Sequence, residues 1–145
     1  MIINSGIDIV DIRRIKKTID KYNLKFKKRC FRLEEINKSE SRLKSAESYA
    51  KRYAAKEACA KALGTGLARG VFWKDIEVKN NKYGKPYLCL HNNAKNFLYN
   101  KISKKAKIEL SLSDEKDFAI ANVNIFEWNR KKNLSVISNQ FYLLF

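Results

Sequence analysis

Glu57 and Lys61 stand four residues apart in a stretch rich in Ala, Lys and Glu. In an α-helix this spacing places two side chains about 40° apart around the axis, on one face. The simplest interpretation is a surface ion pair, which stabilises a helix by only a few tenths of a kcal/mol. The neighbouring residues Ala54, Ala55 and Ala58 are small, however, and let other backbone approach closely. We therefore expect the charged pair to lie near packed structure.

Asp8 lies in an apolar stretch, between Ile7 and Ile9. An unpaired carboxylate in such a setting is costly, so a cation or several donors should meet it. Alternatively, Asp8 caps the helix that follows. Asp8 and Glu57 together suit a magnesium site, because Mg²⁺ takes one or two carboxylates along with water and substrate phosphate. A neighbouring lysine such as Lys61 suits the same phosphate as a point charge.

Two glycines, Gly64 and Gly66, flank Thr65 directly after this stretch. Glycines allow backbone amides to approach a phosphate closely. The same residues are also typical of a helix C-cap followed by a turn. Both interpretations stay open at this point.

A long helix is predicted over residues 41–63, because the segment has strong helix formers and ends at a glycine. Residues 2–9 read as a buried strand, and apolar residues spaced three or four apart predict a helix from Ile9 to about Tyr22. The other expected elements are a short helix or loop over 31–41, strands at 76–78 and 87–90 joined by a turn, an amphipathic helix over 92–105, and a hairpin of 107–112 with 118–123. This order predicts an α+β fold with a mostly antiparallel sheet packed against the long helix.

The chain of 145 residues has a formal net charge of +16, and its length suits one domain. Such a charge favours a polyanionic partner, namely nucleic acid, anionic lipid, a phosphorylated ligand or an acidic protein. Between Arg13 and Arg32 there are ten Lys or Arg residues and one acid, Asp20. The abundance of Lys, Ile and Asn is equally typical of a biased genomic composition, so the charge alone does not identify a partner.

Cys30, Cys59 and Cys89 are widely spaced and share the chain with one histidine, His91. This pattern argues against a zinc site. An odd number of cysteines in a Lys-rich chain fits the reducing cytoplasm better than secretion. We expect neither a signal peptide nor a membrane helix, since no apolar run approaches about 20 residues.

Four segments resemble signatures of the acyl-carrier-protein synthase family, within the 4'-phosphopantetheinyl transferase superfamily. Their order and spacing agree with that family across about residues 1–126, which we expect to form the transferase domain. Residues 127–145 would be a C-terminal tail or an extra packing element. The matching segments are GIDIVDIRR at 6–14, RYAAKEACAKALGTG at 52–66, GKP at 84–86, and LSLSDE at 110–115 followed by FAIA at 118–121.

The resemblance implies transfer of 4'-phosphopantetheine from coenzyme A to a serine of acyl carrier protein. Asp8 and Glu57 would hold Mg²⁺, and Lys61 would contact the phosphate and assist the leaving adenosine 3',5'-bisphosphate. The base for the serine would be Glu57 or a water on the metal. Family members form trimers with active sites between neighbouring subunits. The implied nucleotide contacts are Arg52, Lys56, Lys61, Gly64, Thr65, Gly66, Lys85 and Pro86, and the implied carrier contacts are Arg14, Lys17 and Lys21.

Two departures from the family pattern stand out. Asp114 occupies a position where many members have His, which affects the nucleotide side of the site, and Tyr53 replaces a usual Phe. One alternative function is transfer to other carrier domains, although the compact length favours the short trimeric class. The other alternative is a basic nucleic-acid-binding module, with Tyr22, Phe26 and Phe31 among the lysines. That alternative has no recognisable nucleic-acid-binding signature and leaves Asp8 and Glu57 unexplained, so we expect no nucleic acid partner.

Overall fold

The computed structural model describes residues 1–127. The tail expected at 127–145 therefore lies, apart from its first residue, outside the described residues, and the domain boundary stays a prediction. Within the described part no helix is both long and apolar enough to cross a membrane. The elements in order are β1 (Ile2–Asp11), α1 (Ile12–Cys30), α2 (Leu33–Glu40), α3 (Ser45–Leu63), η1 (Trp73–Asp75), β2 (Ile76–Asn80), β3 (Pro86–Leu90), α4 (Asn92–Phe97), η2 (Leu98–Ile102), β4 (Ala106–Glu115) and β5 (Phe118–Glu127).

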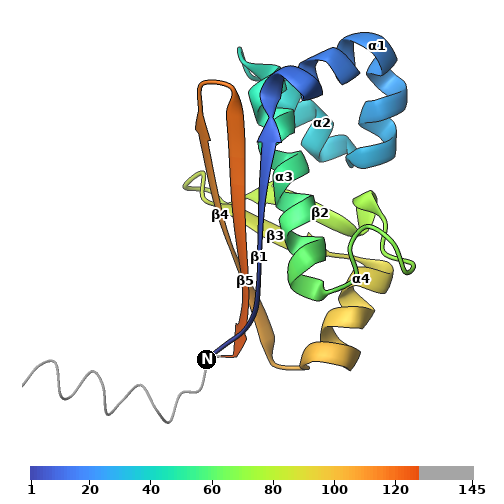
Figure 1. The fold of residues 1–145 in the computed structure, drawn as a ribbon, viewed down its shortest axis with the longest axis vertical. Helices are drawn as coiled ribbons and strands as arrows, with labels where there is room; N and C mark the ends of the chain where they lie inside the picture. Colours follow the sequence, from blue (N-terminus) through green and yellow to red (C-terminus); the bar gives the residue numbers. More distant parts are fainter. Residues whose placement is uncertain (128–145) are drawn as a thin grey trace, which may run out of the picture.

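The strands form a three-stranded sheet of order β1-β5-β4 and a separate hairpin of β2 and β3 (Figure 1). All three strand pairs are antiparallel, with Ile9 opposite Ile120 in β1 and β5, and Val78 opposite Leu88 in the hairpin. The expected α+β class with antiparallel strands is thus confirmed.

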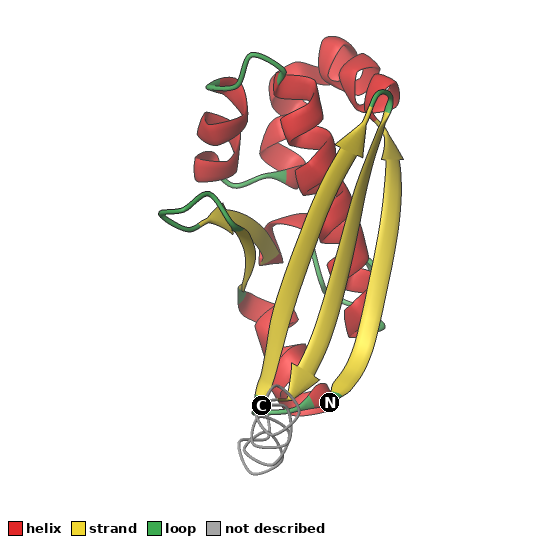
Figure 2. Cartoon of the chain, turned by 90° about the vertical axis from the view of Figure 1, so that its left-hand side faces the viewer, coloured by secondary structure: helices red, strands yellow, loops and turns green. Residues whose placement is uncertain are grey.

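Helix α3 packs on one face of the three-stranded sheet, and Figure 2 shows the other face uncovered. The contact is close because both surfaces carry small residues: Ala58 of α3 and Ala121 of β5 are fully buried. Gly6 of β1 is the tightest point. A Cβ atom there would lie 2.0 Å from the carbonyl oxygen of Ala58, so only glycine fits. Asp8 lies two residues further along β1 and therefore on the same face, toward α3.

Strand β1 departs from its prediction as a buried strand. Gly6 is buried, but Ile7 and Ile9 are 60% and 61% exposed. The residues of the strand alternate between α3 and the uncovered face, so an apolar sequence does not make both faces buried. The strand also runs on to Asp11, whose carboxylate accepts a hydrogen bond from the Arg13 amide at 2.9 Å and caps α1. The alternative of Asp8 as a helix cap was therefore wrong.

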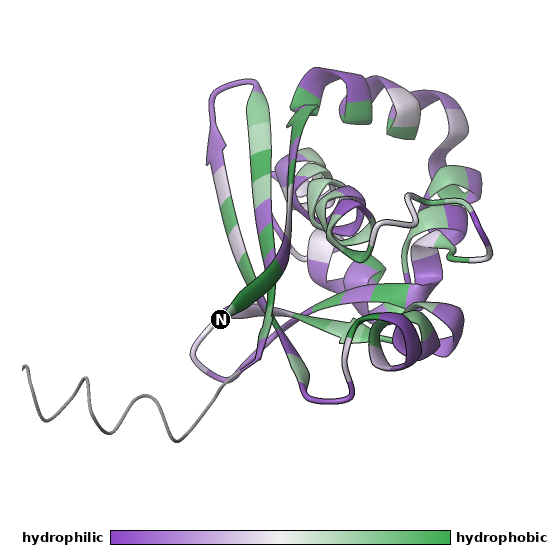
Figure 3. Cartoon of the chain, turned by 60° about the horizontal axis from the view of Figure 1, so that its bottom comes forward, coloured by the Kyte–Doolittle hydropathy of each residue, from purple (hydrophilic) through white to green (hydrophobic). Residues whose placement is uncertain are grey.

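The uncovered face of the sheet carries large apolar side chains in register. Ile9 lies opposite Ile120, and Phe118 lies two residues before Ile120, at the start of β5. These residues are 39–61% exposed together with Ile7, and green apolar bands recur along the strands in Figure 3. An apolar surface of this kind is typical of a protein–protein contact.

The helices also differ in length from their predictions. Helix α1 starts after β1 and reaches Cys30, with a break at Asn23, where φ is 36°. Asparagine tolerates such left-handed backbone better than most residues, which explains why the helix bends there. The short α2 falls within the segment expected as helix or loop. The predicted helix over 92–105 ends early, as α4 followed by a π-helical turn at Leu98–Ile102.

Candidate active site

Lys61 does not pair with Glu57, as the spacing along the helix allowed, but reaches across to β1. Its Nζ lies 2.8 Å from Oδ1 of Asp8 and donates a second hydrogen bond to the carbonyl of Ile7 at 3.0 Å. The side chain of Asp8 is 15% exposed and that of Lys61 is 52% exposed. The cation that Asp8 was expected to need is therefore Lys61, and the pair remains open to solvent on the lysine side.

Asp8 and Glu57 line the same pocket, of about 310 Å³, between β1, α1 and α3. The structure thus brings together the two carboxylates predicted to hold a metal, and it adds Arg14 from α1. The lining of this pocket is a mixture of polar, apolar and aromatic side chains. Its other lining residues are Ile9, Val10, Ile15, Thr18, Phe26 and Tyr53.

The electrostatics of this pocket favour a cation. Burial raises the pKa of Glu57, the negative charge of Asp8 raises it further, and Lys61 partly offsets both effects. Burial and Glu57 together also raise the pKa of Tyr53 to about 12, so its hydroxyl stays protonated. The negative charge of Asp8 makes ionisation of Glu57 less favourable, and a bound cation would relieve that repulsion.

The donor set fits magnesium better than a transition metal. Among residues 1–127 no group of three or more His, Cys, Asp or Glu side chains is placed to hold a metal. Mg²⁺ needs only one or two carboxylates from the protein, since water and substrate phosphate complete its coordination. Asp8 and Glu57 are the carboxylates of this pocket that could hold such an ion.

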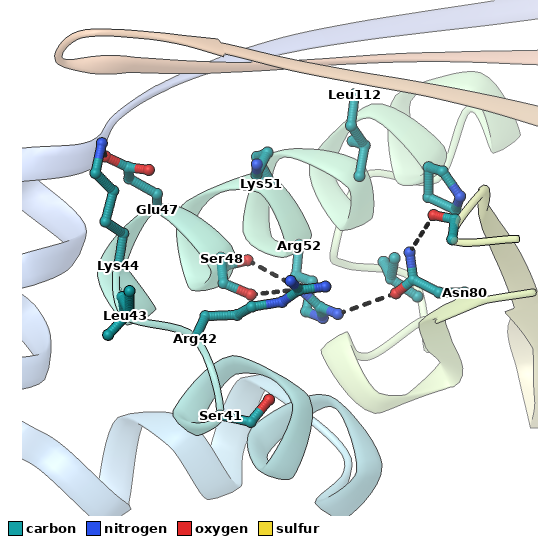
Figure 4. Close-up of a pocket in the computed structure, with 13 residues that line it drawn as sticks. Ser41, Arg42, Leu43, Lys44, Glu47, Ser48, Lys51, Arg52, Asn80 and Leu112 are labelled. Atoms are coloured by element: carbon teal, nitrogen blue, oxygen red, sulfur yellow. Dashed lines mark hydrogen bonds and ion pairs between the residues drawn. The ribbon is translucent and has the colours of Figure 1, made fainter.

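A second, basic pocket of about 630 Å³ lies between α3, the hairpin β2–β3 and the connection from α2 to α3 (Figure 4). Arg52 lies at its base and is 7% exposed. The Arg52 guanidinium donates to Oγ of Ser48 at 2.7 Å and to Oδ1 of Asn80 at 3.3 Å, while its Nε has no partner. The pocket's other basic lining residues are Arg42, Lys44 and Lys51, and its hairpin side includes Asn80, Gly84 and Pro86.

The predicted nucleotide contacts divide between this pocket and other places. Arg52 and Pro86 line the basic pocket, as a nucleotide site requires. Lys85 is exposed and forms an ion pair with Glu109 at 3.1 Å. Three lining residues of the basic pocket were not predicted, because charge was their only signal: Arg42, Lys44 and Lys51. Lys51 also forms a 2.6 Å ion pair with Asp114, the residue found where many family members have His.

Lys56 is not placed to contact a nucleotide. Its side chain is fully buried, and its ammonium group donates to Oε2 of Glu35 at 2.8 Å and to the carbonyls of Trp73 and Ile76. All three donors of the ammonium are therefore used inside the protein. The expectation for Lys56 fails because the sequence shows its charge but not the side of α3 on which it lies.

The glycine loop acts as a helix cap. The amides of Thr65 and Gly66 both donate to the carbonyl of Ala60 at 3.2 Å. The amide of Gly64 donates to the backbone carbonyl of Lys61 at 3.0 Å. Gly64 has a φ of 78°, as expected for a residue that ends a helix. These three amides are engaged with α3, so the C-cap interpretation is the one the geometry supports, and a phosphate cradle is not.

The three predicted carrier contacts all lie on α1. Arg14 lines the carboxylate pocket, and Arg14 and Lys17 also line a shallow groove along α1. Lys21 lies one turn further on, with Nζ 5.0 Å from the centre of the Tyr22 ring. The aromatic residues proposed for nucleic acid binding are less suitable, since Phe31 is 1% exposed and its ring lies against that of Phe26 at 5.8 Å.

Comparison with known proteins identifies the family to which the chain belongs. The family model of the 4'-phosphopantetheinyl transferase superfamily matches residues 4–123. The chain is 47% identical over 121 residues to a holo-[acyl-carrier-protein] synthase of Rhizobium rhizogenes, covering 83% of this chain and 90% of the relative. It is 49% identical over 127 residues to the protein of the same name from Agrobacterium fabrum, covering 86% and 95%.

Solved structures give the same result. Holo-[acyl-carrier-protein] synthase of Neisseria meningitidis superposes with a TM-score of 0.79 at 33% identity, covering 88% of this chain and all of the other. The Bacillus anthracis synthase, in complex with coenzyme A (3',5'-ADP), has a TM-score of 0.71 at 35% identity over 88% and 99%. The resemblance found in the four sequence segments is thereby confirmed: the chain belongs to the 4'-phosphopantetheinyl transferase superfamily, and the relatives it is similar to are holo-[acyl-carrier-protein] synthases.

Proposed function

We propose that the chain transfers 4'-phosphopantetheine from coenzyme A to a serine of apo acyl carrier protein, with Mg²⁺ as cofactor. The products are the holo carrier and adenosine 3',5'-bisphosphate. The observation that carries this proposal is the convergence of Asp8 and Glu57 on one pocket, with a half-exposed Lys61 paired to Asp8 at 2.8 Å. In this reaction the serine oxygen bonds to the β-phosphorus of coenzyme A, and the bond from that phosphorus to the bridging oxygen of the pyrophosphate breaks.

Each polar residue of the pocket has a distinct task in that step. Asp8 and Glu57 would hold Mg²⁺, which, when bound, supplies positive charge to the pyrophosphate oxygens. Lys61 is half exposed and supplies a point charge to the phosphate as negative charge builds on the leaving group. Glu57 or a water on the metal would accept the serine proton. A Glu57→Gln variant that kept full turnover would remove both roles of this residue.

The basic pocket is the proposed site of the nucleotide. Arg52, Lys44 and Lys51 supply positive charge there, and Asn80 and Pro86 form the hairpin wall. Phosphate oxygens of coenzyme A have the matching charge.

Helix α1 is the proposed docking surface for the acidic carrier protein. Arg14 connects this surface to the reaction pocket, and Lys17 and Lys21 continue it along the helix. We expect Arg14→Glu to raise the KM for the carrier strongly and to leave the affinity for coenzyme A nearly unchanged, because α1 is the proposed carrier surface and the nucleotide half of coenzyme A is assigned to the basic pocket. Equal losses for both substrates would contradict the assignment.

We also propose a homotrimer, assembled through the uncovered face of the sheet. Ile7, Ile9, Phe118 and Ile120 give this face an apolar surface that a second copy of the chain would cover. Light scattering of the wild type and of an Ile9→Asp variant tests the assembly: a trimer that Ile9→Asp converts to a monomer is expected, and an unchanged mass would contradict the proposal.

We also propose that the enzyme is cytoplasmic, because the chain has the free thiols Cys30, Cys59 and Cys89, which suit a reducing compartment.

Intact-mass spectrometry of apo acyl carrier protein, incubated with the protein, coenzyme A and magnesium, tests the proposed function directly. We expect a gain of about 340 Da that is lost with EDTA or with Asp8→Ala, since both remove the metal site. No gain from folded wild-type protein would contradict transfer to this carrier. Carrier domains of peptide and polyketide synthases, included in the same experiment, would then reveal the alternative of a different carrier.

A further inference from the structure

Glu35 is a buried carboxylate with both oxygens hydrogen-bonded, and nothing in the proposed reaction uses it. Its side chain is fully buried, as is that of its partner Lys56. Oε2 of Glu35 accepts from Nζ of Lys56 at 2.8 Å and from the amide of Arg32 at 2.9 Å. Oε1 accepts from the amide of Val78 at 3.0 Å. One carboxylate thus joins the start of α2, the middle of α3 and strand β2.

Lys56 extends this junction to a fourth segment. Besides Glu35, its ammonium group binds the carbonyls of Trp73 and Ile76, which lie in η1 and at the start of β2. The same ammonium lies 5.4 Å from the ring centre of Phe31, just before α2. Every hydrogen bond of this cluster is made inside the protein, so it cannot exchange partners with a substrate without breaking these links.

The elements joined at Glu35 and Lys56 are those that form the basic pocket. Helix α3 supplies Arg52, one helical turn before Lys56. Strand β2 supplies Val78, which lines the pocket while its amide binds Glu35. Two residues further along β2, Asn80 accepts from the Arg52 guanidinium at 3.3 Å (Figure 4). The shape of the basic pocket therefore depends on the position of β2 relative to α3.

We propose that Glu35 is a positioning residue for nucleotide binding, acting through Lys56 and Val78 to hold the β2–β3 hairpin against Arg52; this inference rests on the proposed function. The carboxylate touches neither substrate nor metal. Its effect falls on the affinity for the nucleotide half of coenzyme A, and not on the carrier, which meets α1. A displacement of the hairpin by about 1 Å is enough to weaken such a site severely.

The test is calorimetric titration of the full-length protein with adenosine 3',5'-bisphosphate, alongside steady-state kinetics with both substrates. We expect Glu35→Ala to weaken binding of this nucleotide about tenfold or more and to raise the KM for coenzyme A in parallel, with the carrier KM within about twofold of wild type. Leu98→Ala is the matched control: Leu98 is buried in the core, and it lines neither pocket, so this variant loses stability without touching the nucleotide site. An equal loss of nucleotide affinity in Leu98→Ala would mean a general effect of stability and would overturn the proposal.

A second variant keeps the proposal testable if Glu35→Ala fails to fold. The pair Glu35→Gln/Lys56→Met removes both charges at nearly constant volume and leaves no buried ion unpaired. It still loses the links from Lys56 to Trp73 and Ile76, so we expect folded protein with several-fold weaker nucleotide binding. Wild-type affinity in this variant would overturn the proposal. Wild-type protein that binds the nucleotide but transfers nothing would instead remove the proposed function and leave the positioning role of Glu35 standing.

Discussion

Two carboxylate–lysine pairs on α3 have the same geometry and different surroundings. Lys61 with Asp8 and Lys56 with Glu35 both have an Nζ–oxygen distance of 2.8 Å. Lys61 is half exposed and its other protein acceptor is one carbonyl, whereas Lys56 is fully buried and all its donors are used. The Lys61–Asp8 pair, called the open pair, can exchange a partner for substrate phosphate. The Lys56–Glu35 pair, called the closed pair, can only stabilise the structure. Exposure and donor use, not distance, separate a reactive ion pair from a structural one.

The largest expected effect comes from breaking the open pair. We expect Asp8→Asn to slow transfer by about a hundredfold or more, because it removes a carboxylate that would hold the metal. The free energy of unfolding should change by less than about 1 kcal/mol, since pairs this exposed contribute little to stability. Initial rates by intact-mass spectrometry and denaturant unfolding measure the two quantities. A large loss of stability with little loss of rate would reverse the roles assigned to the two pairs.

Breaking the closed pair should have the opposite profile. Glu35→Gln leaves Lys56 as a buried charge without its counter-ion, and we expect a loss of about 3–5 kcal/mol in the free energy of unfolding. Adding Lys56→Met should restore most of that loss, because replacing a whole buried pair by groups of similar volume is often neutral. Denaturant unfolding of the single and double variants gives the comparison. A double variant no more stable than the single one would show that the cluster contributes through more than its charges.

Gly6→Ala should affect the open pair through the backbone. The new Cβ would lie 2.0 Å from the carbonyl oxygen of Ala58, so β1 must move away from α3. We expect a loss of about 1–3 kcal/mol of stability, typical of overpacking, and a fall in transfer because Asp8 moves with its strand. Ser5→Ala, on the exposed side of β1, is the control and should change neither quantity. A stable and fully active Gly6→Ala protein would show that the carboxylate pocket tolerates movement of β1.

The smallest effect concerns thiol reactivity around the closed pair. Burial raises the pKa of Cys30 to about 11 and that of Cys59 to about 12, so both thiols stay protonated and shielded at pH 8. Cys89 is only partly buried. Alkylation followed by peptide mass spectrometry should modify Cys89 first, and modify Cys30 and Cys59 only when the protein unfolds. Faster labelling of Cys30 in Glu35→Gln would show that α2 opens when the pair is broken.

The sequence was sufficient to predict the carboxylate pocket. Asp8 interrupts an apolar strand, and Glu57 interrupts a run of small residues on the best helix. A carboxylate among apolar or small residues costs free energy, so these two positions indicate a functional site even when the fold is not known. The structure brings both into one pocket with Arg14.

The sequence was not sufficient to assign the lysines or the strand faces. Lys56 and Lys61 belong to the same Ala-rich helix, where small residues surround the axis and no apolar stripe shows which side is inward. Ile7 and Ile9 look as buried as Val10, because β-branched residues occupy both faces of β1. The Gly64–Gly66 segment is compatible with a phosphate cradle until its amides are seen to cap α3. Each of these distinctions depends on long-range packing that local patterns do not contain.

The pairing of β1 with β5 has a consequence for how the protein folds. Asp8 lies in β1, the first strand of the described chain, which pairs with β5, the last one. Helix α3 can form from local contacts, but within residues 1–127 the strand partner of β1 is the distant β5. Contacts so distant in sequence are slow to form. We therefore expect the β1 wall of the carboxylate pocket to form late in folding, once this long-range pairing is in place.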